Sequence, residues 1–500
     1  MSLVDRTCAA LDQAIAVYRG TEHAERLTAI RDRLDEPLRV AIAGRVKAGK
    51  STLLNALVGE RLAPTDAGEC TRIITWYRDG HTYEVLAHPR EGEPRQLRFS
   101  REEGALEIDL GGLEPDDVTE LIVTWPSQAL RTSTLIDTPG IGSLSRQTAA
   151  RTWEVLADDD ETPADAVLYL MRHLHPQDVQ FLQAFHDAEV SRPNPVNAIG
   201  VLSRADEIGV GRLDSMASAR KIAKRLSLDG RVRRVVQAVV PVAGLLAETA
   251  ATVTETEVGQ LRKISERSAR SVENLLLTAD RFVNQMPELG LTSIERSALL
   301  DRFGLFGVRL ATALLRRGAV STATELAAEL TDRSGVNELR TVLESLFFER
   351  RDILKSRSAL LALDALTRTE PRDGSEAVAA AVEEIIAGAH PFQELRVLSA
   401  LRSGWVTGKP AVLEDLERII GGAGGAVPDR LGLPAEADAA DLAQVAGKAL
   451  AGWQQRAENP LTSHELAIAA RVAVRSCEGI LAELSAQKPS VAVPAESGGA

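Results

Sequence analysis

This sequence has little cysteine, no long apolar run and no excess of positive charge. Its 3 cysteines, Cys8, Cys70 and Cys477, show neither a pairing pattern nor metal-site spacing, which argues against a disulfide scaffold and indicates a reducing cytosol. No apolar segment approaches the roughly 20 residues that a membrane-spanning helix needs, and we expect no secretory leader. A formal net charge of -13 argues against general nucleic-acid binding. We expect a cytoplasmic protein, and 500 residues allow more than one domain.

The most informative motif is GRVKAGKS at residues 44–51, which matches the phosphate-loop pattern G-x-x-x-x-G-K-[ST]. An apolar run at 38–43 precedes it and a helical pattern follows it, as this motif requires. Lys50 would reach the β- and γ-phosphates, and the Ser51 hydroxyl would bind Mg²⁺. The alternative is a glycine-rich turn that fits by chance. The residues expected to bind the phosphates are Gly44, Val46, Lys47, Ala48, Gly49, Lys50, Ser51 and Thr52.

Two later segments indicate which nucleotide binds. The strand-like run at 134–137 ends in D-x-x-G, where Asp137 would hold Mg²⁺ through a water and Gly140 would contact the γ-phosphate. A second strand-like run ends in Ser203, Arg204, Ala205 and Asp206, similar to the guanine-reading [NT]-K-x-D motif. The Asp206 carboxylate can accept from both guanine N–H donors, and Arg204 can cover the base. In this order and spacing, the motifs favour GTP and GDP over adenine nucleotides.

The chain changes character near residue 250. Up to that point strands and helices alternate, which predicts an α/β P-loop domain with a doubly wound, mostly parallel sheet. Beyond it, long helical patterns predict an elongated all-α bundle. Strands are expected at 38–43, 73–77, 83–87, 121–125, 134–136, 166–171, 197–202 and 235–240. The long helices are expected at 258–286, 294–315, 322–330, 336–365, 377–387, 393–401 and 440–486.

The chain resembles the bacterial dynamin-like proteins, a family of large GTPases that remodel or tether membranes, and within them the isoniazid-induced proteins of mycobacteria. The resemblance rests on GRVKAGKSTLLNAL at 44–57, Thr71 in the sequence CTR, DTPGIG at 137–142, and the helical block from 305 to 355. It implies a GTPase domain enclosed by neck helices from both termini. The expected parts are a neck helix at 1–36, the GTPase domain at 37–247, a neck helix at 248–290, a trunk with a membrane tip at 291–438, returning helices at 439–487 and a disordered tail at 488–500.

The resemblance also implies catalytic roles. Thr71 would bind Mg²⁺ and position the attacking water, although it could instead be a structural threonine at the start of a strand. Arg45 would act as an arginine finger, or else be a solvated residue on the rim of the loop. Val46 departs from the family because its side chain cannot form hydrogen bonds. Ala243, within residues 241–244, would belong to the loop that closes over the base.

A membrane tip needs exposed apolar residues beside basic ones. Two segments fit this description, and each has a simpler explanation, either a basic helix C-terminus or a tryptophan that covers a loop. The candidate tip residues are Leu314, Leu315, Arg316 and Arg317 in the first segment and Trp405 and Lys409 in the second.

Two functions are therefore compatible with the sequence. In the first, GTP hydrolysis drives fission, fusion or tethering of anionic phospholipid membranes on the inner face of the cytoplasmic membrane, with self-association through the GTPase domain. In the second, the protein is a regulatory GTPase switch whose helical half binds a protein or ribosomal partner. The long helices and the absence of a basic RNA-binding module favour the first.

Overall fold

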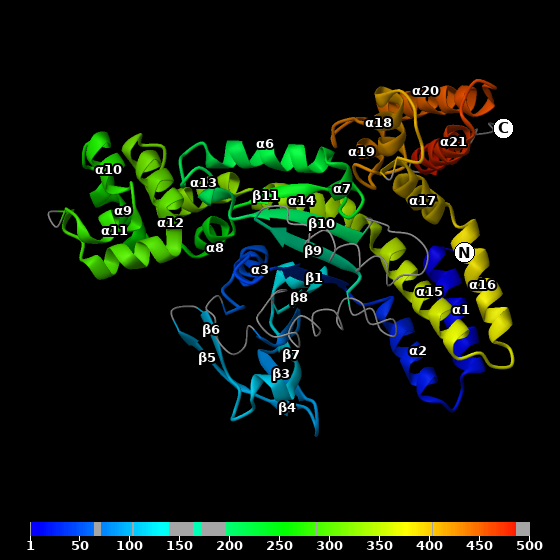
Figure 1. The fold of residues 1–500 in the computed structure, drawn as a ribbon, viewed down its shortest axis with the longest axis horizontal. Coiled ribbons are helices and arrows are strands. Elements are labelled where there is room, and N and C mark those ends of the chain that lie inside the picture. The colour runs from blue at the N-terminus through cyan, green and yellow to red at the C-terminus, as the bar shows by residue number, and fades with distance from the viewer. Residues whose placement is uncertain are drawn as a thin grey trace, which may run out of the picture. The chain divides into compact units, whose positions relative to one another are not determined.

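The computed structural model describes residues 2–64, 72–102, 105–139, 164–172, 197–286, 289–402 and 404–486. It divides into two compact units, Met1–Val382 and Glu383–Ala500 (Figure 1). This division lies inside the segment 291–438 expected to form one trunk. The assignment of neck and trunk therefore stays a prediction, and each unit is described by itself.

The described residues of the first unit form a nine-stranded sheet in the order β11-β10-β9-β1-β8-β2-β7-β3-β4. The strands β1, β8, β9, β10 and β11 run parallel, as predicted, whereas β2 is antiparallel to β8, and β3 is antiparallel to both β7 and β4. A separate hairpin joins β5 to β6. The strands are β1 Leu38–Gly44, β2 Ile74–Arg78, β3 Glu84–Pro89, β4 Arg95–Gln96, β5 Arg98–Glu102, β6 Ala105–Asp109, β7 Val118–Thr124, β8 Ser133–Asp137, β9 Ala166–Met171, β10 Ala198–Ser203 and β11 Val239–Val242.

The central strands are apolar because both faces of the sheet are covered. All residues of β9 and β10 are buried, and in β1 only Arg39 is partly exposed. Such continuous apolar runs are typical of parallel strands between helical layers. The expected strand at 235–240 begins later, at Val239, because the amides of Val235 and Val236 bond to the Val232 carbonyl and form a turn.

Helices of the first unit share one hydrophobic core with the sheet. Tyr169 of β9, Phe303 and Leu330 belong to the same buried cluster, so the helices after residue 250 pack as part of the sheet-containing unit. The helices of the first unit, of which α6 to α13 contribute to this cluster, are α1 Leu3–Val17, α2 Glu22–Arg33, α3 Lys50–Val58, α6 Ser215–Leu228, α7 Gly230–Arg233, α8 Gly244–Thr252, α9 Glu255–Ser265, α10 Ala269–Leu275, α11 Ala279–Asn284, α12 Ser293–Arg316, α13 Ala323–Ser334, α14 Val336–Leu346 and α15 Arg351–Thr369. Helix α16, Ser375–Gly388, begins in the first unit and ends in the second.

Several long helical patterns form shorter helices than expected. The pattern at 258–286 forms α9, α10 and α11, because the Ser268 and Thr278 side chains accept backbone amides and start new helices. The pattern at 336–365 is interrupted by a 3₁₀ turn, Phe348–Arg350. Helix α12 matches its expected span and starts with a capping box between Thr292 and Glu295, but it is kinked at Gly304.

The N-terminal helices are attached to α15. Helix α1 packs beside α2 and α15, and the Tyr18 hydroxyl donates to the Glu370 carbonyl at 2.8 Å (Figure 1). At the other end, Lys355 donates to the Arg33 and Glu36 carbonyls. Arg351 donates to the Glu36 carbonyl at 2.6 Å. Arg33 is the last residue of α2 and Glu36 lies just beyond it, so the two cations bind carbonyl groups at the C-terminal end of the helix, where the helix dipole is negative.

The second unit is helical. Its core surrounds the fully buried Trp453 and includes Cys477, while a polar group joins α17 to α21 through the Ser476 hydroxyl, which donates to Glu394 at 2.6 Å. No helix among the described residues is long and apolar enough to cross a membrane. The helices are α17 His390–Arg402, α18 Pro410–Ile419, α19 Val427–Leu431, α20 Ala439–Glu458 and α21 His464–Ala486.

Candidate functional site

The phosphate loop connects β1 to α3 through left-handed backbone. Gly44, Lys47 and Gly49 have φ values of 149°, 61° and 93°. A Cβ atom on Gly44 would lie 2.7 Å from the carbonyl oxygen of Leu170 in β9, so only glycine fits there. The loop therefore turns tightly and ends at the N-terminus of α3, where free amides and the helix dipole attract anions.

Lys50, Ser51 and Asp137 meet at the end of this loop. The Ser51 hydroxyl donates to Asp137 Oδ2 at 2.7 Å. Burial lowers the pKa of Lys50, an effect that the nearby Asp137 charge opposes. Burial raises the pKa of Asp137, whereas Lys50 and Ser51 act in the other direction. The ammonium donates to the Gly44 and Arg45 carbonyls at 3.5 and 3.4 Å, so its bonds to the protein are long.

The oxygen atoms beside Lys50 fit a magnesium ion. Asp137 Oδ1 is buried and has no hydrogen-bond partner among the described residues, and the Ser51 hydroxyl lies beside the same carboxylate. Mg²⁺ prefers oxygen ligands and is commonly held by one or two protein groups together with substrate phosphates. The described residues contain no group of three or more acidic, histidine or cysteine side chains that could hold a metal by themselves. Thr71 and Gly140, the other residues expected here, lie outside the described residues.

A pocket of about 150 Å³ brings the phosphate loop and the base-reading motif together. Ala48, Gly49 and Thr52 line it from the loop and α3, while Ser203, Arg204 and Asp206 line it from the end of β10. The third wall begins at the end of β11. Three segments that are far apart in the sequence therefore meet at the carboxyl ends of parallel strands, where open α/β sheets bind ligands. The residues of the third wall are Val242, Gly244 and Leu245.

Asp206 is the buried carboxylate at the β10 side of the pocket. Its side chain belongs to the 3₁₀ turn Ala205–Glu207, and the residue is only 8% exposed. Burial raises the pKa of Asp206 to about 6. A carboxylate in such a place is suited to a partner that offers two N–H donors, because each bond repays part of the lost hydration.

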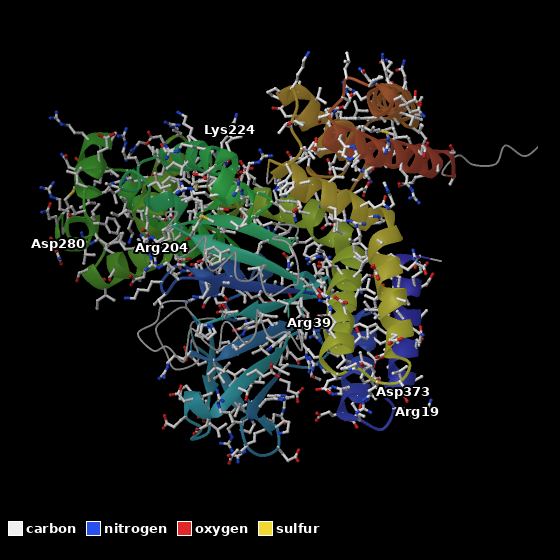
Figure 2. All side chains as sticks on the ribbon, turned by 45° about the vertical axis from the view of Figure 1, so that its right-hand side comes forward. Arg19, Arg39, Arg204, Lys224, Asp280 and Asp373 are labelled. Carbon is white, nitrogen blue, oxygen red and sulfur yellow. The ribbon has the colours of Figure 1, made fainter. Side chains whose placement is uncertain are left out.

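Ser203 and Arg204, which precede Asp206 in the motif, form local contacts. Arg204 has a left-handed backbone with φ of 52°, and its guanidinium pairs with Glu207 at 2.8 Å. Figure 2 shows Arg204 at the side of the sheet that faces α9–α12, and α12 contacts the 3₁₀ turn that follows it. The Ser203 hydroxyl makes a long bond of 3.4 Å to the Met171 carbonyl.

Four further residues of the predicted site do not line this pocket. Arg45, Val46 and Lys47 are exposed, and Val46 is 48% exposed. Ala243 is buried, and its amide donates to the Ser334 carbonyl at 2.8 Å. The pocket is lined by Val242 and Gly244, the two neighbours of Ala243, and not by Ala243 itself.

The sequence comparisons agree with this geometry. The Dynamin family model matches residues 40–205. The isoniazid-induced protein IniC of Mycobacterium tuberculosis is 42% identical over 497 residues, which cover 98% of this chain and 100% of the relative. This chain belongs to the bacterial dynamin-like family. Both the predicted family and the predicted fold are confirmed, and the chain is a dynamin-family GTPase.

Other relatives match shorter parts of this dynamin-like protein. A bacterial dynamin-like protein of Nostoc punctiforme is 33% identical over 28% of this chain and 21% of its own length. The isoniazid-induced protein IniA of Mycobacterium tuberculosis is 31% identical over 32% of this chain and 25% of its own. A solved structure of an oligomerised bacterial dynamin pair aligns with 97% of this chain and 75% of its own chain, with 13% identity and a TM-score of 0.29.

The two expected tip segments of this dynamin-like chain differ in their surroundings. Leu314 is only 7% exposed, and the Arg316 side chain donates to the Ser265 carbonyl at 3.1 Å, so both contribute to helix packing; Leu315 and Arg317 flank them. Trp405 is 75% exposed, and Lys409 is also exposed. The second segment therefore presents the more accessible apolar side chain.

Leu245 and Glu207 are among the pocket-lining residues that the sequence analysis missed. Leu245 lies just after the segment expected to close over the base, and Glu207 lies next to Asp206 and pairs with Arg204 and Arg172. Position next to a motif was the only signal for Glu207. For Leu245 the signal was the apolar start of α8, which also suits an ordinary core residue.

Proposed function

We propose that this dynamin-like protein binds and hydrolyses GTP in the pocket between α3, β10 and β11, and that the turnover acts on anionic membranes. The observation that carries the proposal is the pocket itself, which joins the phosphate loop to Asp206 within one cavity. A guanine ring bound at Asp206 extends its phosphates toward the α3 N-terminus, where the loop amides and Lys50 supply positive charge.

Hydrolysis requires attack of water on the γ-phosphorus and departure of GDP. Lys50 would stabilise charge on the phosphate oxygens, and its partly buried position strengthens this interaction. Ser51 and Asp137 would hold Mg²⁺, which neutralises phosphate charge when bound. Thr71 and Gly140 are proposed to orient water and to contact the γ-phosphate, and Arg45 is proposed as an arginine finger.

Self-association is proposed to occur across the nucleotide face. Three apolar side chains are exposed near the pocket: Val46 on the phosphate loop at 48%, and Val210 and Leu213 after the base-reading motif at 73% and 53%. Pairing of two such faces would cover these side chains and would bring Arg45 of each subunit close to the other nucleotide.

Membrane contact is proposed at one end of the second unit. Trp405 is 75% exposed and Leu461, in the α20–α21 turn, is 93% exposed. A Cβ atom on Gly408 would lie 3.4 Å from Leu466 Cδ2, so the loop that carries Trp405 lies against the first turns of α21. The two exposed apolar residues therefore belong to adjacent loops. Tryptophan and leucine flanked by Lys409 suit the interfacial region of a bilayer.

The test is GTP hydrolysis by the purified full-length chain with and without anionic liposomes, together with co-sedimentation. We expect GTP turnover and salt-sensitive binding to liposomes. The double variant Trp405→Ser with Leu461→Ser should weaken liposome binding more than tenfold, because each side chain loses about 1.5–3 kcal/mol of apolar burial. Ile294→Ser is the matched control, since Ile294 is equally exposed, at 81%, but lies in the first unit.

Each outcome decides between the functions. Turnover without lipid binding at any salt concentration would favour the regulatory switch that binds a protein partner. An equal loss of lipid binding in the Ile294→Ser control would remove Trp405 and Leu461 as the tip. Absence of both GTP binding and turnover would contradict the proposed site.

A further inference from the structure

The loop that follows Asp206 has an unusual backbone. Gly209, Val210 and Gly211 have φ values of 64°, 64° and 66°, so three successive residues are left-handed. Val210 is β-branched, and a β-branched residue rarely adopts this conformation because its side chain crowds the backbone. Val210 is also 73% exposed, so packing of its own side chain does not compensate for the strain. Another contact must hold this loop.

Arg309 of α12 provides that contact. Its guanidinium donates to the Val210 carbonyl at 2.7 Å, and also to the carbonyls of Gly211 and Leu276. Among the described residues Arg309 has no carboxylate partner, so its hydrogen-bonding capacity is directed at these three carbonyls. A planar guanidinium with several fixed donors is suited to hold adjacent carbonyls in one geometry, which a lysine ammonium does less well.

The kink of α12 brings this helix next to the base-reading carboxylate. Gly304, inside α12, has φ of 62° and ψ of 173°, which is not helical. A Cβ atom there would lie 3.9 Å from Asp206 Oδ2 and 3.6 Å from Leu245 Cδ2. A Cβ atom on Gly211 would lie 3.4 Å from the Phe306 amide nitrogen and 3.6 Å from the Asp206 carbonyl oxygen. The kink, the left-handed loop and Asp206 are thus in mutual contact.

We infer that Arg309, together with the kink at Gly304, positions Asp206 for guanine and so determines the selectivity for bases that carry a 2-amino group. The inference rests on the proposed function, because it requires a nucleotide in this pocket. Arg309 does not line the pocket and acts through the loop, so it is a positioning residue. Without it, Val210 can return to a right-handed or extended backbone and the Asp206 carboxylate loses its fixed orientation.

The same contact connects the base side to the helices after residue 250. The Leu276 carbonyl accepts from Arg309 at the end of α10, and the N-terminal half of α12 contacts α9 through Arg302, which pairs with Glu257 at 2.9 Å. Guanine selectivity in this protein therefore depends on residues about 100 positions away from the motif that contacts the base.

The test compares GDP with inosine diphosphate, which keeps the N1–H donor but lacks the 2-amino group. Dissociation constants are measured by calorimetry on the full-length wild type and on Arg309→Met, which keeps the apolar stem. We expect Kd for GDP to rise about tenfold in the variant, as for loss of about one charge-assisted hydrogen bond, while Kd for inosine diphosphate changes less than threefold. Arg309→Lys should recover part of the selectivity.

The matched control is Arg262→Met, because Arg262 also donates to a backbone carbonyl, that of Ser321 at 2.6 Å, but lies on α9 away from the pocket. This control should leave both constants unchanged. An equal loss of affinity for both nucleotides in Arg309→Met, or no loss of affinity for either, would overturn the inference. If Arg309→Met does not fold, as judged by thermal unfolding, the ratio of the two constants is measured in Arg309→Lys and Gly304→Ala, and an unchanged ratio in both overturns it. Failure of the wild type to bind GDP instead contradicts the proposed function.

Discussion

The proposed phosphate side and the proposed base side of the pocket are built in opposite ways. The phosphate side is continuous in sequence: Gly44 to Ser51 forms the loop, and the backbone angles of two glycines give it its shape. The base side has a short motif that ends at Asp206, and the loop after it is held by Arg309, which is about 100 positions further along the chain. The first side carries its geometry in local sequence, whereas the second takes it from tertiary contacts.

This difference explains why one motif can be recognised completely and the other only in part. A phosphate needs amides and one cation, which an eight-residue segment can supply. A base edge must be met by a carboxylate at a fixed distance and angle, and a four-residue segment cannot fix these alone. Changes on the phosphate side should therefore reduce turnover, and changes on the base side should mainly alter affinity and selectivity.

The largest effect is expected from Lys50→Ala on the phosphate side. Loss of the ammonium should reduce GTP turnover on the order of a thousandfold, as for removal of a preorganised donor to developing negative charge. Steady-state phosphate release measures it, and an unchanged thermal unfolding midpoint checks the fold. Undiminished turnover in a folded variant would disprove the assignment of this loop.

A smaller effect on binding is expected from Asp206→Asn on the base side. GDP affinity at pH 7 should fall about a hundredfold, because two hydrogen bonds to a charged acceptor are lost or weakened. The same substitution should stabilise the protein without nucleotide by up to about 3 kcal/mol, since the raised pKa shows that the charged form is disfavoured on folding. Calorimetry measures the expected loss of GDP affinity, and thermal unfolding measures the expected gain in stability. A variant that loses both affinity and stability would contradict this account.

The pH dependence of GDP binding should follow the titration of Asp206. Folding raises the pKa of Asp206 from 3.8 to about 6, so the folded protein without nucleotide binds the extra proton between these values. The contribution of this carboxyl to stability is therefore fully present below pH 3.8 and is lost as the pH rises through 6. Guanine needs the ionised form, so GDP affinity should fall about tenfold between pH 7 and pH 5. The Asp206→Asn variant should show no such fall, and a persistent fall would assign it to another group.

The smallest effect is expected from Ser203→Ala. The hydroxyl makes only a 3.4 Å bond to the Met171 carbonyl, which is long for a hydroxyl donor. Kd for GDP should therefore change less than threefold. A larger change would show that Ser203 takes part in binding the base, as its place in the motif suggested.

The sequence predicted the phosphate loop, Asp137 and the parallel strands because each depends on local pattern. Asp206, whose role at the base stays a prediction, lines the same pocket as the phosphate loop because the end of β10 lies at the same sheet edge. It did not predict the kink at Gly304, because a single glycine in an amphipathic pattern is compatible with a straight helix. It did not predict the break at Ser268 either, because hydrophobic spacing continues across the capping residue.

The contacts of Lys355 and Arg351 with the end of α2 have a consequence for engineering. The hydrogen bonds of Arg351 join it to residues that lie 316 and 315 positions earlier in the chain. The chain therefore leaves the helices α1, α2 and α15 before β1 and returns to them after α14 at the same place. In polymer terms the segment from β1 to α14 is a ring closed by hydrogen bonds. The entropic cost of such a ring grows only with the logarithm of its length, about 0.6 kcal/mol for each doubling. A reporter domain inserted in an exposed turn of the ring should therefore cost little, and a single protease cut there should leave both fragments bound to each other.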